Sequence, residues 1–137
     1  YTGFNNGVYK AGFATSQDSY NEEVVRIFEV LDEVEEILAT NRYLTGDHVT
    51  EADWRFLPTL LRFDPVYVGH FKCNLRRVAD YPHVHNYMVD LMKTFDLADT
   101  FNLDHVKHHY YGSHPTINPT LIVPRGPEQD LGLFSPN

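Results

Sequence analysis

The spacing of apolar residues in the first third of the chain predicts a long amphipathic helix. Between Glu22 and Leu38, apolar side chains recur at intervals of three and four residues, at Val24, Ile27, Phe28, Leu31, Val34 and Leu38. Seven acidic residues and Arg26 fill most of the other positions. We therefore expect one face in the core and one acidic face in solvent. Ser19, three residues before Glu22, is a candidate N-cap in a capping box, and Ser16 is the alternative.

A second capping signal predicts where the next helix begins. Thr50 lies three residues before Asp53, so its hydroxyl is placed to accept from the Asp53 amide while the carboxylate accepts from the Thr50 amide. We expect the helix to run to about Asp64, because Pro65 discourages continuation. Pro58 lies inside this helix and predicts a kink or a lost hydrogen bond.

Further helices are predicted in the second half of the chain. The stretch "DYPHVHNYMVDLMK" (80–93) places Pro82 in a first helical turn and apolar residues on one side. Shorter helical pieces are expected at 97–101 and 104–111. No internal repeat and no convincing alternating strand is present, so the pattern predicts an all-α bundle of four or five helices.

The last part of the chain has a different composition. After Gly112, five of the eight prolines lie between Pro115 and Pro136. This predicts a proline-rich extended C-terminal tail that lies on the domain surface or on a partner. We expect residues 1–137 to form one domain with this tail.

Composition and charge narrow the possible partners. The sequence is 42% hydrophobic and 14% aromatic, which suffices for a packed core. Nineteen acidic against eleven basic residues give a net charge of −8, so nucleic acid and membrane surfaces are not expected as partners. No apolar run approaches the roughly 20 residues needed to span a bilayer.

A single cysteine, Cys73, cannot form an internal disulfide, which fits a reducing compartment, and a cytoplasmic location is expected. "HFKCN" gives no reason for a depressed thiol pKa, so Cys73 is expected to be a buried small side chain rather than a reactive thiol. The sequence starts with "YTGFNNGVYK" and lacks an initiator methionine, so we expect a fragment or a processed piece.

The stretch "HVKHHYYGSHPTINP" (105–119) combines imidazole and phenol groups. His105, His108 and His109 have helical spacing and could in principle hold a metal ion. However, the run has no fixed carboxylate or cysteine partner, so structural or solvent-facing histidines and no metal are expected.

Three stretches, together with the Thr50–Asp53 cap, resemble one known family. They are "NNGVYKAGFA" (5–14), "LLRFDPVYVGHFKCN" (60–74) and "HYYGSHPTINPT" (109–120). The combination resembles the C-terminal domain of glutathionyl-hydroquinone reductases, the Xi-class glutathione transferases, over nearly all 137 residues. The fold that this resemblance implies is the helical bundle of the glutathione transferase C-terminal domain.

The resemblance implies a two-domain enzyme of which this chain is one half. Family members carry an N-terminal thioredoxin-like domain with the nucleophilic cysteine and most glutathione-binding residues, and this sequence has neither. Cys73 is then not the nucleophile, and the chain alone is expected to be inactive. The implied reaction reduces a glutathionyl-hydroquinone to hydroquinone with glutathione as co-substrate, releasing oxidised glutathione. The helical half supplies the hydroquinone pocket and the contact of a homodimer.

The resemblance also implies roles for three tyrosines. Tyr9 is similar to the proton donor and acceptor, while Tyr67 and Tyr110 are similar to residues that stabilise the thiolate of the N-terminal domain. Tyrosine suits both tasks because a phenol, with a pKa of about 10, stays neutral and donates a hydrogen bond. Tyr111 receives no role. The sequence does not decide whether Arg62, Asp64 and His109 line the pocket. Arg62 and Asp64 could instead form a local ion pair or cap a helix.

The sequence leaves other functions open. Each tyrosine could be an ordinary packing residue. The protein could be a glutathione transferase that conjugates electrophiles, which would need a serine or tyrosine instead of the nucleophilic cysteine. It could also be a non-catalytic interaction module, because a fold alone does not prove activity. Convergence of the three hydroxyls would favour the enzyme, and scattered hydroxyls would favour the module.

Overall fold

The computed structural model describes residues 2–126, and these are helical without a β-strand. The α-helices are α1 (Thr2–Gly12), α2 (Gln17–Thr40), α3 (Glu51–Arg62), α4 (Pro82–Thr94) and α5 (Leu103–Ser113). Three short turns join them: the π-helical η1 (Phe63–Tyr67) and the 3₁₀-helical η2 (Val78–Asp80) and η3 (Ala98–Thr100). The predicted all-α class is confirmed. The prolines at 127 and 136 lie outside the described residues.

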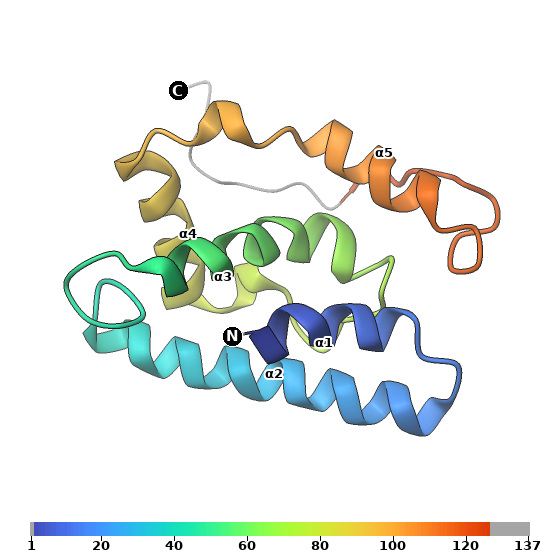
Figure 1. Ribbon diagram of the computed structural model, residues 1–137, viewed down its shortest axis with the longest axis horizontal. Coiled ribbons are helices and arrows are strands. Elements are labelled where there is room, and N and C mark those ends of the chain that lie inside the picture. Colours follow the sequence, from blue (N-terminus) through green and yellow to red (C-terminus); the bar gives the residue numbers. More distant parts are fainter. Residues whose placement is uncertain (1, 127–137) are drawn as a thin grey trace.

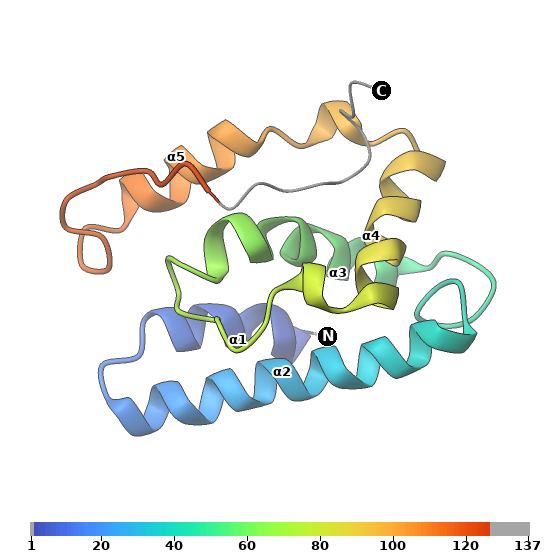
Figure 2. The same ribbon diagram turned by 180° about the vertical axis from the view of Figure 1, so that it is seen from behind.

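The helices stack in tiers (Figures 1 and 2). α1 and α2 form an antiparallel hairpin at one edge, α3 lies above it, and α5 runs across the opposite edge. α4 lies at one end, where it contacts both α2 and α3. α5 packs on η1, so the late part of the chain returns to the turn that follows α3.

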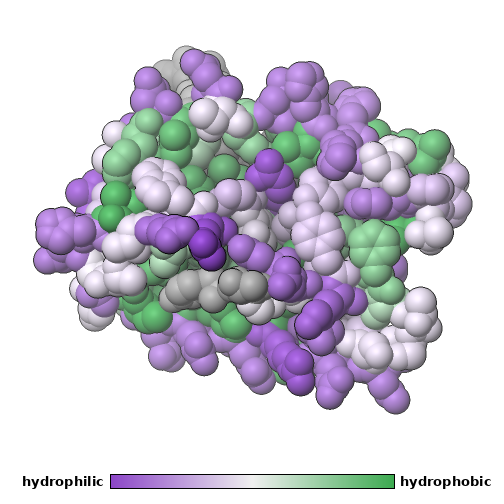
Figure 3. Space-filling view, viewed as in Figure 1, coloured by the Kyte–Doolittle hydropathy of each residue, from purple (hydrophilic) through white to green (hydrophobic). Residues whose placement is uncertain are grey.

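The buried face of α2 consists of the six apolar residues that the spacing predicts. Its acidic face lies along the lower edge of the molecule, where hydrophilic side chains gather (Figure 3). Ser16, rather than Ser19, is the N-cap, since its hydroxyl accepts from the Ser19 amide at 3.2 Å. The helix therefore begins at Gln17, before the first apolar residue of the pattern.

Helix α1 is an element that the hydrophobic pattern did not predict. Gly3, Gly7 and Gly12 lower its intrinsic helix propensity, each by about 1 kcal/mol relative to alanine. The helix forms because Phe4 and Val8 bury one side of it in the core. Gly7 helps this packing, since a Cβ there would lie 3.3 Å from a side-chain carbon of Ile27 in α2.

The predicted capping box of α3 is confirmed, and the α-helix ends at Arg62, close to the predicted end near Asp64. The Thr50 amide donates to the Asp53 carboxylate at 2.8 Å. Beyond Arg62, helical geometry continues through Pro65 as η1, in which the Val68 amide donates to the Phe63 carbonyl at 2.9 Å. A π-turn is wider than an α-turn, so it gives the proline ring room and requires no amide from it.

The helices of the second half agree with the prediction. Pro82 is at the start of α4, and the Glu35 carboxylate accepts from the amides of His83 and Val84 at that helix end. The short pieces expected at 97–101 and 104–111 correspond to η3 and α5. Asn102 caps α5 by accepting from the His105 amide at 3.0 Å.

Candidate functional site

The three tyrosines singled out in the sequence meet in space. They come from α1, η1 and α5, yet the hydroxyl oxygens of Tyr9 and Tyr110 are 2.5 Å apart, and those of Tyr67 and Tyr110 are 3.1 Å apart. Tyr110 is therefore the central member of a hydrogen-bonded row. Tyr67 and Tyr110 are 2% and 8% exposed, whereas Tyr9 is 40% exposed. The row thus runs from the interior to the surface.

The three phenols offer their O–H groups at one place. Each phenol carries one O–H; the Tyr110 hydroxyl is within hydrogen-bond distance of both neighbours, and Tyr9 and Tyr67 also interact with each other. An anion that reaches these hydroxyls can accept one of the O–H groups in place of a neighbouring phenol. Such a donor suits an anion, because hydrogen bonds to a charged acceptor are about twice as strong as neutral ones.

The surroundings keep Tyr9 and Tyr67 protonated. Burial raises the pKa of Tyr67 far above that of a free phenol, and its hydrogen bond with Tyr110 raises it further. Burial also raises the pKa of Tyr9, while the positive charge of Arg62 lowers it to a smaller degree. Near neutral pH, Tyr9 and Tyr67 are therefore hydrogen-bond donors and proton sources rather than phenolates.

The ring of Phe71 packs against the tyrosine rings. The sequence analysis gave this residue no role. Its ring stacks on Tyr67 with centroids 5.3 Å apart and planes at 3°, and it lies 5.2 Å from the ring of Tyr9. Gly12 makes this possible, because a Cβ there would lie 2.2 Å from the Phe71 ring. Gly12 and Phe71 both lie inside the motifs that carry the family resemblance, and those motifs are the sequence feature that could have identified them.

Asp64, Arg62 and His109, which the sequence left undecided as pocket residues, make different contacts near the site. The buried Asp64 carboxylate accepts from the amides of Val78 and Ala79 at 2.6 and 3.1 Å, so it caps η2. Burial raises the pKa of Asp64, and those two amides oppose the rise. Arg62 donates to the Pro58 carbonyl and lies over the Phe101 ring. His109 contacts Tyr110 edge-on at 5.3 Å from the exposed side of α5, so it borders the site.

The cysteine and the histidines of α5 form no second reactive centre among residues 2–126. Cys73 is fully buried, which confirms the expected burial, and burial raises its pKa to about 12. His105 and His108 are exposed, and His108 pairs with the carbonyl of Asp104. No group of three or more His, Cys, Asp or Glu in this part of the chain is arranged to hold a metal ion.

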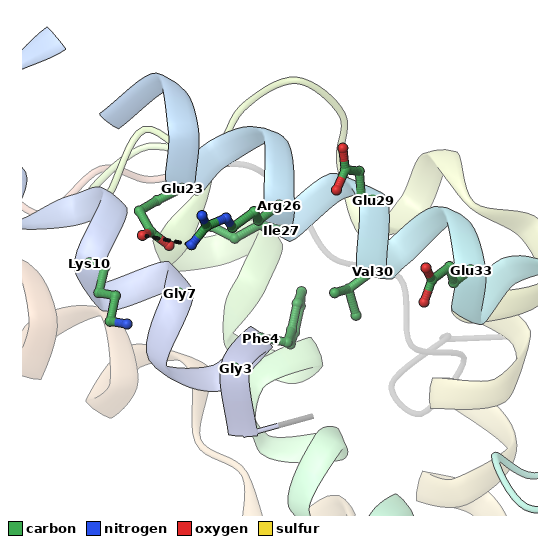
Figure 4. Close-up of a pocket in the computed structure, with 10 residues that line it drawn as sticks. All are labelled: Gly3, Phe4, Gly7, Lys10, Glu23, Arg26, Ile27, Glu29, Val30 and Glu33. Carbon is green, nitrogen blue, oxygen red and sulfur yellow. Dashed lines mark ion pairs between the residues drawn. The ribbon is translucent and has the colours of Figure 1, made fainter. Parts of the chain in front are cut away.

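A groove between α1 and α2 is separate from the tyrosines. It has a volume of about 540 Å³ and contains none of the three phenols. Charged side chains line much of it, as Figure 4 shows, namely Lys10, Glu23, Arg26, Glu29 and Glu33. Glu23 and Arg26 form an ion pair at 3.6 Å, so part of this charge is neutralised locally.

Comparison with known proteins places this site in a family context. Residues 17–89 match the family "Glutathione S-transferase, C-terminal domain". The chain is 53% identical to glutathionyl-hydroquinone reductase YqjG of Escherichia coli, over 96% of this chain and 40% of that protein. It is 54% identical to glutathionyl-hydroquinone reductase PcpF of Sphingobium chlorophenolicum, over 96% of this chain and 42% of the relative.

Solved structures agree with the sequence comparison. A glutathione-bound structure of YqjG, a glutathione transferase homolog from Escherichia coli K-12, superposes with a TM-score of 0.93 at 53% identity. The match covers 96% of this chain and 42% of that one. The chain therefore spans about two fifths of the length of these relatives. Among residues 2–126, no helix is both long and apolar enough to cross a bilayer.

Proposed function

Because the chain belongs to the glutathione S-transferase C-terminal domain family, we propose that it is the helical half of a glutathionyl-hydroquinone reductase. The proposal is supported by two relatives of that name, each more than 50% identical over nearly all of this chain. The observation that carries it is the convergence of the hydroxyls of Tyr9, Tyr67 and Tyr110. A packing role needs three rings but does not need their oxygens to meet.

The reaction we propose requires a thiol from outside this chain. A cysteine thiolate in an N-terminal thioredoxin-like domain attacks the sulfur of the glutathionyl-hydroquinone. The carbon–sulfur bond breaks, its electron pair stays on the ring carbon, and a proton is added there to give hydroquinone. The enzyme is left as a mixed disulfide with glutathione. A second glutathione thiolate attacks that disulfide, releasing oxidised glutathione and the enzyme thiolate.

The tyrosine row matches the two tasks of this reaction. A thiolate must exist near neutral pH although a free cysteine has a pKa of about 8.5, and an O–H donor lowers that value by stabilising the anion. Tyr67 and Tyr110 take this role in the proposal. Tyr9, the exposed end of the row, delivers the proton to the ring carbon and regains one when the thiol of the second glutathione ionises.

The other functional readings receive less support. A non-catalytic module has no need for three hydroxyls that meet at one place. Conjugation of electrophiles forms a carbon–sulfur bond, so it has no need for a proton delivered to ring carbon. We further propose that the enzyme is cytoplasmic, uses glutathione as co-substrate, contains no metal and forms a homodimer through this half.

The test is turnover of a glutathionyl-hydroquinone by the full-length protein with Tyr9→Phe. We expect the rate of hydroquinone release to fall by roughly 10²- to 10⁴-fold, the usual size of a lost general acid. Tyr20→Phe is the matched control, because its hydroxyl donates to the Lys72 carbonyl outside the row. An unchanged rate in Tyr9→Phe removes its proton-transfer role, and an inactive wild type removes the reductase assignment.

A further inference from the structure

Two histidines next to the tyrosine row form a direct imidazole pair. Nε2 of His70, in the loop after η1, lies 2.8 Å from Nδ1 of His114 at the end of α5. Their rings stack with centroids 5.1 Å apart and planes at 23°. His70 is only 3% exposed, and its Nδ1 has no hydrogen-bond partner among residues 2–126.

The unpartnered nitrogen determines which way the shared proton points. If His114 donated to His70, the single proton of neutral His70 would sit on Nδ1 as a buried N–H without an acceptor. Such orphaned N–H groups are rare in proteins because they lose a hydrogen bond to water without replacement. The favoured arrangement is therefore His70 Nε2–H donating to a bare Nδ1 of His114. His114 then carries its own proton on Nε2.

The pair joins the two segments that carry the inner tyrosines. The His70 amide donates to the Val66 carbonyl at 2.8 Å, which ties it to the turn that ends in Tyr67. On the other side, His114 is four residues after Tyr110, and their rings contact at 5.8 Å. The imidazole hydrogen bond thus fixes the last turn of α5 against η1.

We propose that the His70–His114 pair is a positioning element for the Tyr110 hydroxyl and acts only while both rings are uncharged. Protonating His70 would create the orphaned Nδ1–H, and protonating His114 on Nδ1 would remove the acceptor. Its effect on turnover rests on the proposed function, whereas the hydrogen bond and its tautomers do not.

The groups that face the pair favour the neutral state. Burial lowers the pKa of both imidazoles most; His114 and then Lys72 on the same loop lower that of His70 further, and His109 on α5 lowers that of His114 further. Tyr110 and Tyr111 present neutral phenol rings from α5, and Phe13 adds an apolar ring after α1. None of these groups is a carboxylate that could hold an imidazolium.

The first test reads the tautomers directly in full-length protein labelled with [¹⁵N]histidine. Multiple-bond ¹H–¹⁵N spectra should show His70 protonated on Nε2 alone at pH 7 and still at pH 6. The signals are assigned by loss in His70→Gln and His114→Asn. An Nδ1–H tautomer, or a charged His70 at pH 6, overturns the proposal. This readout holds even if the wild type lacks reductase activity, which would count against the function alone.

The second test separates positioning from folding through kinetics on a glutathionyl-hydroquinone. His114→Asn keeps a carbonyl oxygen near the position of Nδ1, whereas His114→Phe keeps the ring but removes the acceptor. We expect His114→Phe to lower kcat at least about tenfold with little change in KM, because a small misplacement of a reacting group is costly. His114→Asn should stay within about twofold of wild type, as should the exposed control His105→Asn. Equal kcat in His114→Phe and wild type overturns the positioning role.

Discussion

Tyr110 connects the two other hydroxyls of the site, since its oxygen is within hydrogen-bond distance of both Tyr9 and Tyr67. Its removal would leave the buried Tyr67 hydroxyl without that partner and would isolate Tyr9 at the surface. Single residues outside the row matter in the same way. Phe71 supports the rings from below, and Gly12 allows it to lie there.

Gly12→Ala tests how Phe71 is held, because it adds one carbon atom, Cβ, next to that ring. The added Cβ would lie 2.2 Å from the Phe71 ring, so the ring must move. We expect the free energy of unfolding to fall by about 1–3 kcal/mol, as for other overpacked sites. Chemical denaturation measures it. Gly3→Ala is the control in the same helix, because nothing lies within 4 Å of its Cβ, and there we expect a gain of roughly 0.5–1 kcal/mol.

The sequence motifs predicted the three tyrosines of the site but not the residues that hold them in place. Tyr9, Tyr67 and Tyr110 lie in stretches whose resemblance could be read directly. Phe71 lacks a polar group that would suggest chemistry, and His114 is separated from its partner His70 by more than forty residues. Contacts between residues so far apart in the sequence depend on how α5 packs against η1. The spacing of apolar residues within one helix carries no information about that packing.

Between elements, buried carboxylates hold the helices together. Asp53 accepts from the Thr50 amide at 2.8 Å, from the Leu44 amide at 3.1 Å and from the Tyr87 hydroxyl at 2.7 Å. It therefore joins the start of α3 to the preceding loop and to α4. The sequence indicated the contact with Thr50, since a cap is local. The contact with Tyr87 could not be predicted because it depends on the packing of α4.

Asp53→Ala should be costly because it leaves buried donors without their acceptor. We expect the free energy of unfolding to fall by about 2–4 kcal/mol, more than the loss of a helix cap alone. Urea denaturation followed by circular dichroism measures this loss. Glu51→Ala is the control from the same helical turn, since among residues 2–126 the Glu51 side chain forms an exposed pair with Arg55 alone and should change stability little. Equal effects of the two substitutions would contradict the role given to Asp53.

Helix prediction succeeded where apolar spacing was regular and failed where packing decided the outcome. α2 and α4 follow their patterns closely. α1 forms despite its glycines because burial against α2 outweighs propensity. η1 continues past Pro65 because a wider turn accommodates the ring, and this turn brings Tyr67 inward. A π-turn has no simple sequence signature, so the sequence predicted the end of the α-helix but not the π-turn that follows it.

For the whole molecule, burial of histidine predicts how stability depends on pH. Burial lowers the pKa of His70 to about 4, whereas a histidine in the unfolded chain has a pKa of about 6.5. Between these values the unfolded state binds the proton more readily, so the free energy of unfolding decreases as the pH falls from about 6.5 towards 4. The buried Asp64, with its raised pKa, acts in the opposite direction.

Comparing wild type with His70→Gln isolates this contribution, because Asp64 is common to both. Denaturation at pH 6.5, 5.5 and 4.5 should give a smaller loss of stability on acidification in the variant. Parallel pH profiles for the two proteins would show that His70 is not held neutral by burial.

In the proposed enzyme, the hydroxyls of this domain stabilise a thiolate supplied by another domain. The pKa of the nucleophilic cysteine in the full-length protein can be read from the pH dependence of its alkylation rate, with Cys73 replaced by alanine to remove background. In Tyr110→Phe we expect the midpoint to rise by about one pKa unit or more, equivalent to about 1.4 kcal/mol of lost thiolate stabilisation. An unchanged midpoint would contradict the claim that the tyrosine row serves a sulfur anion.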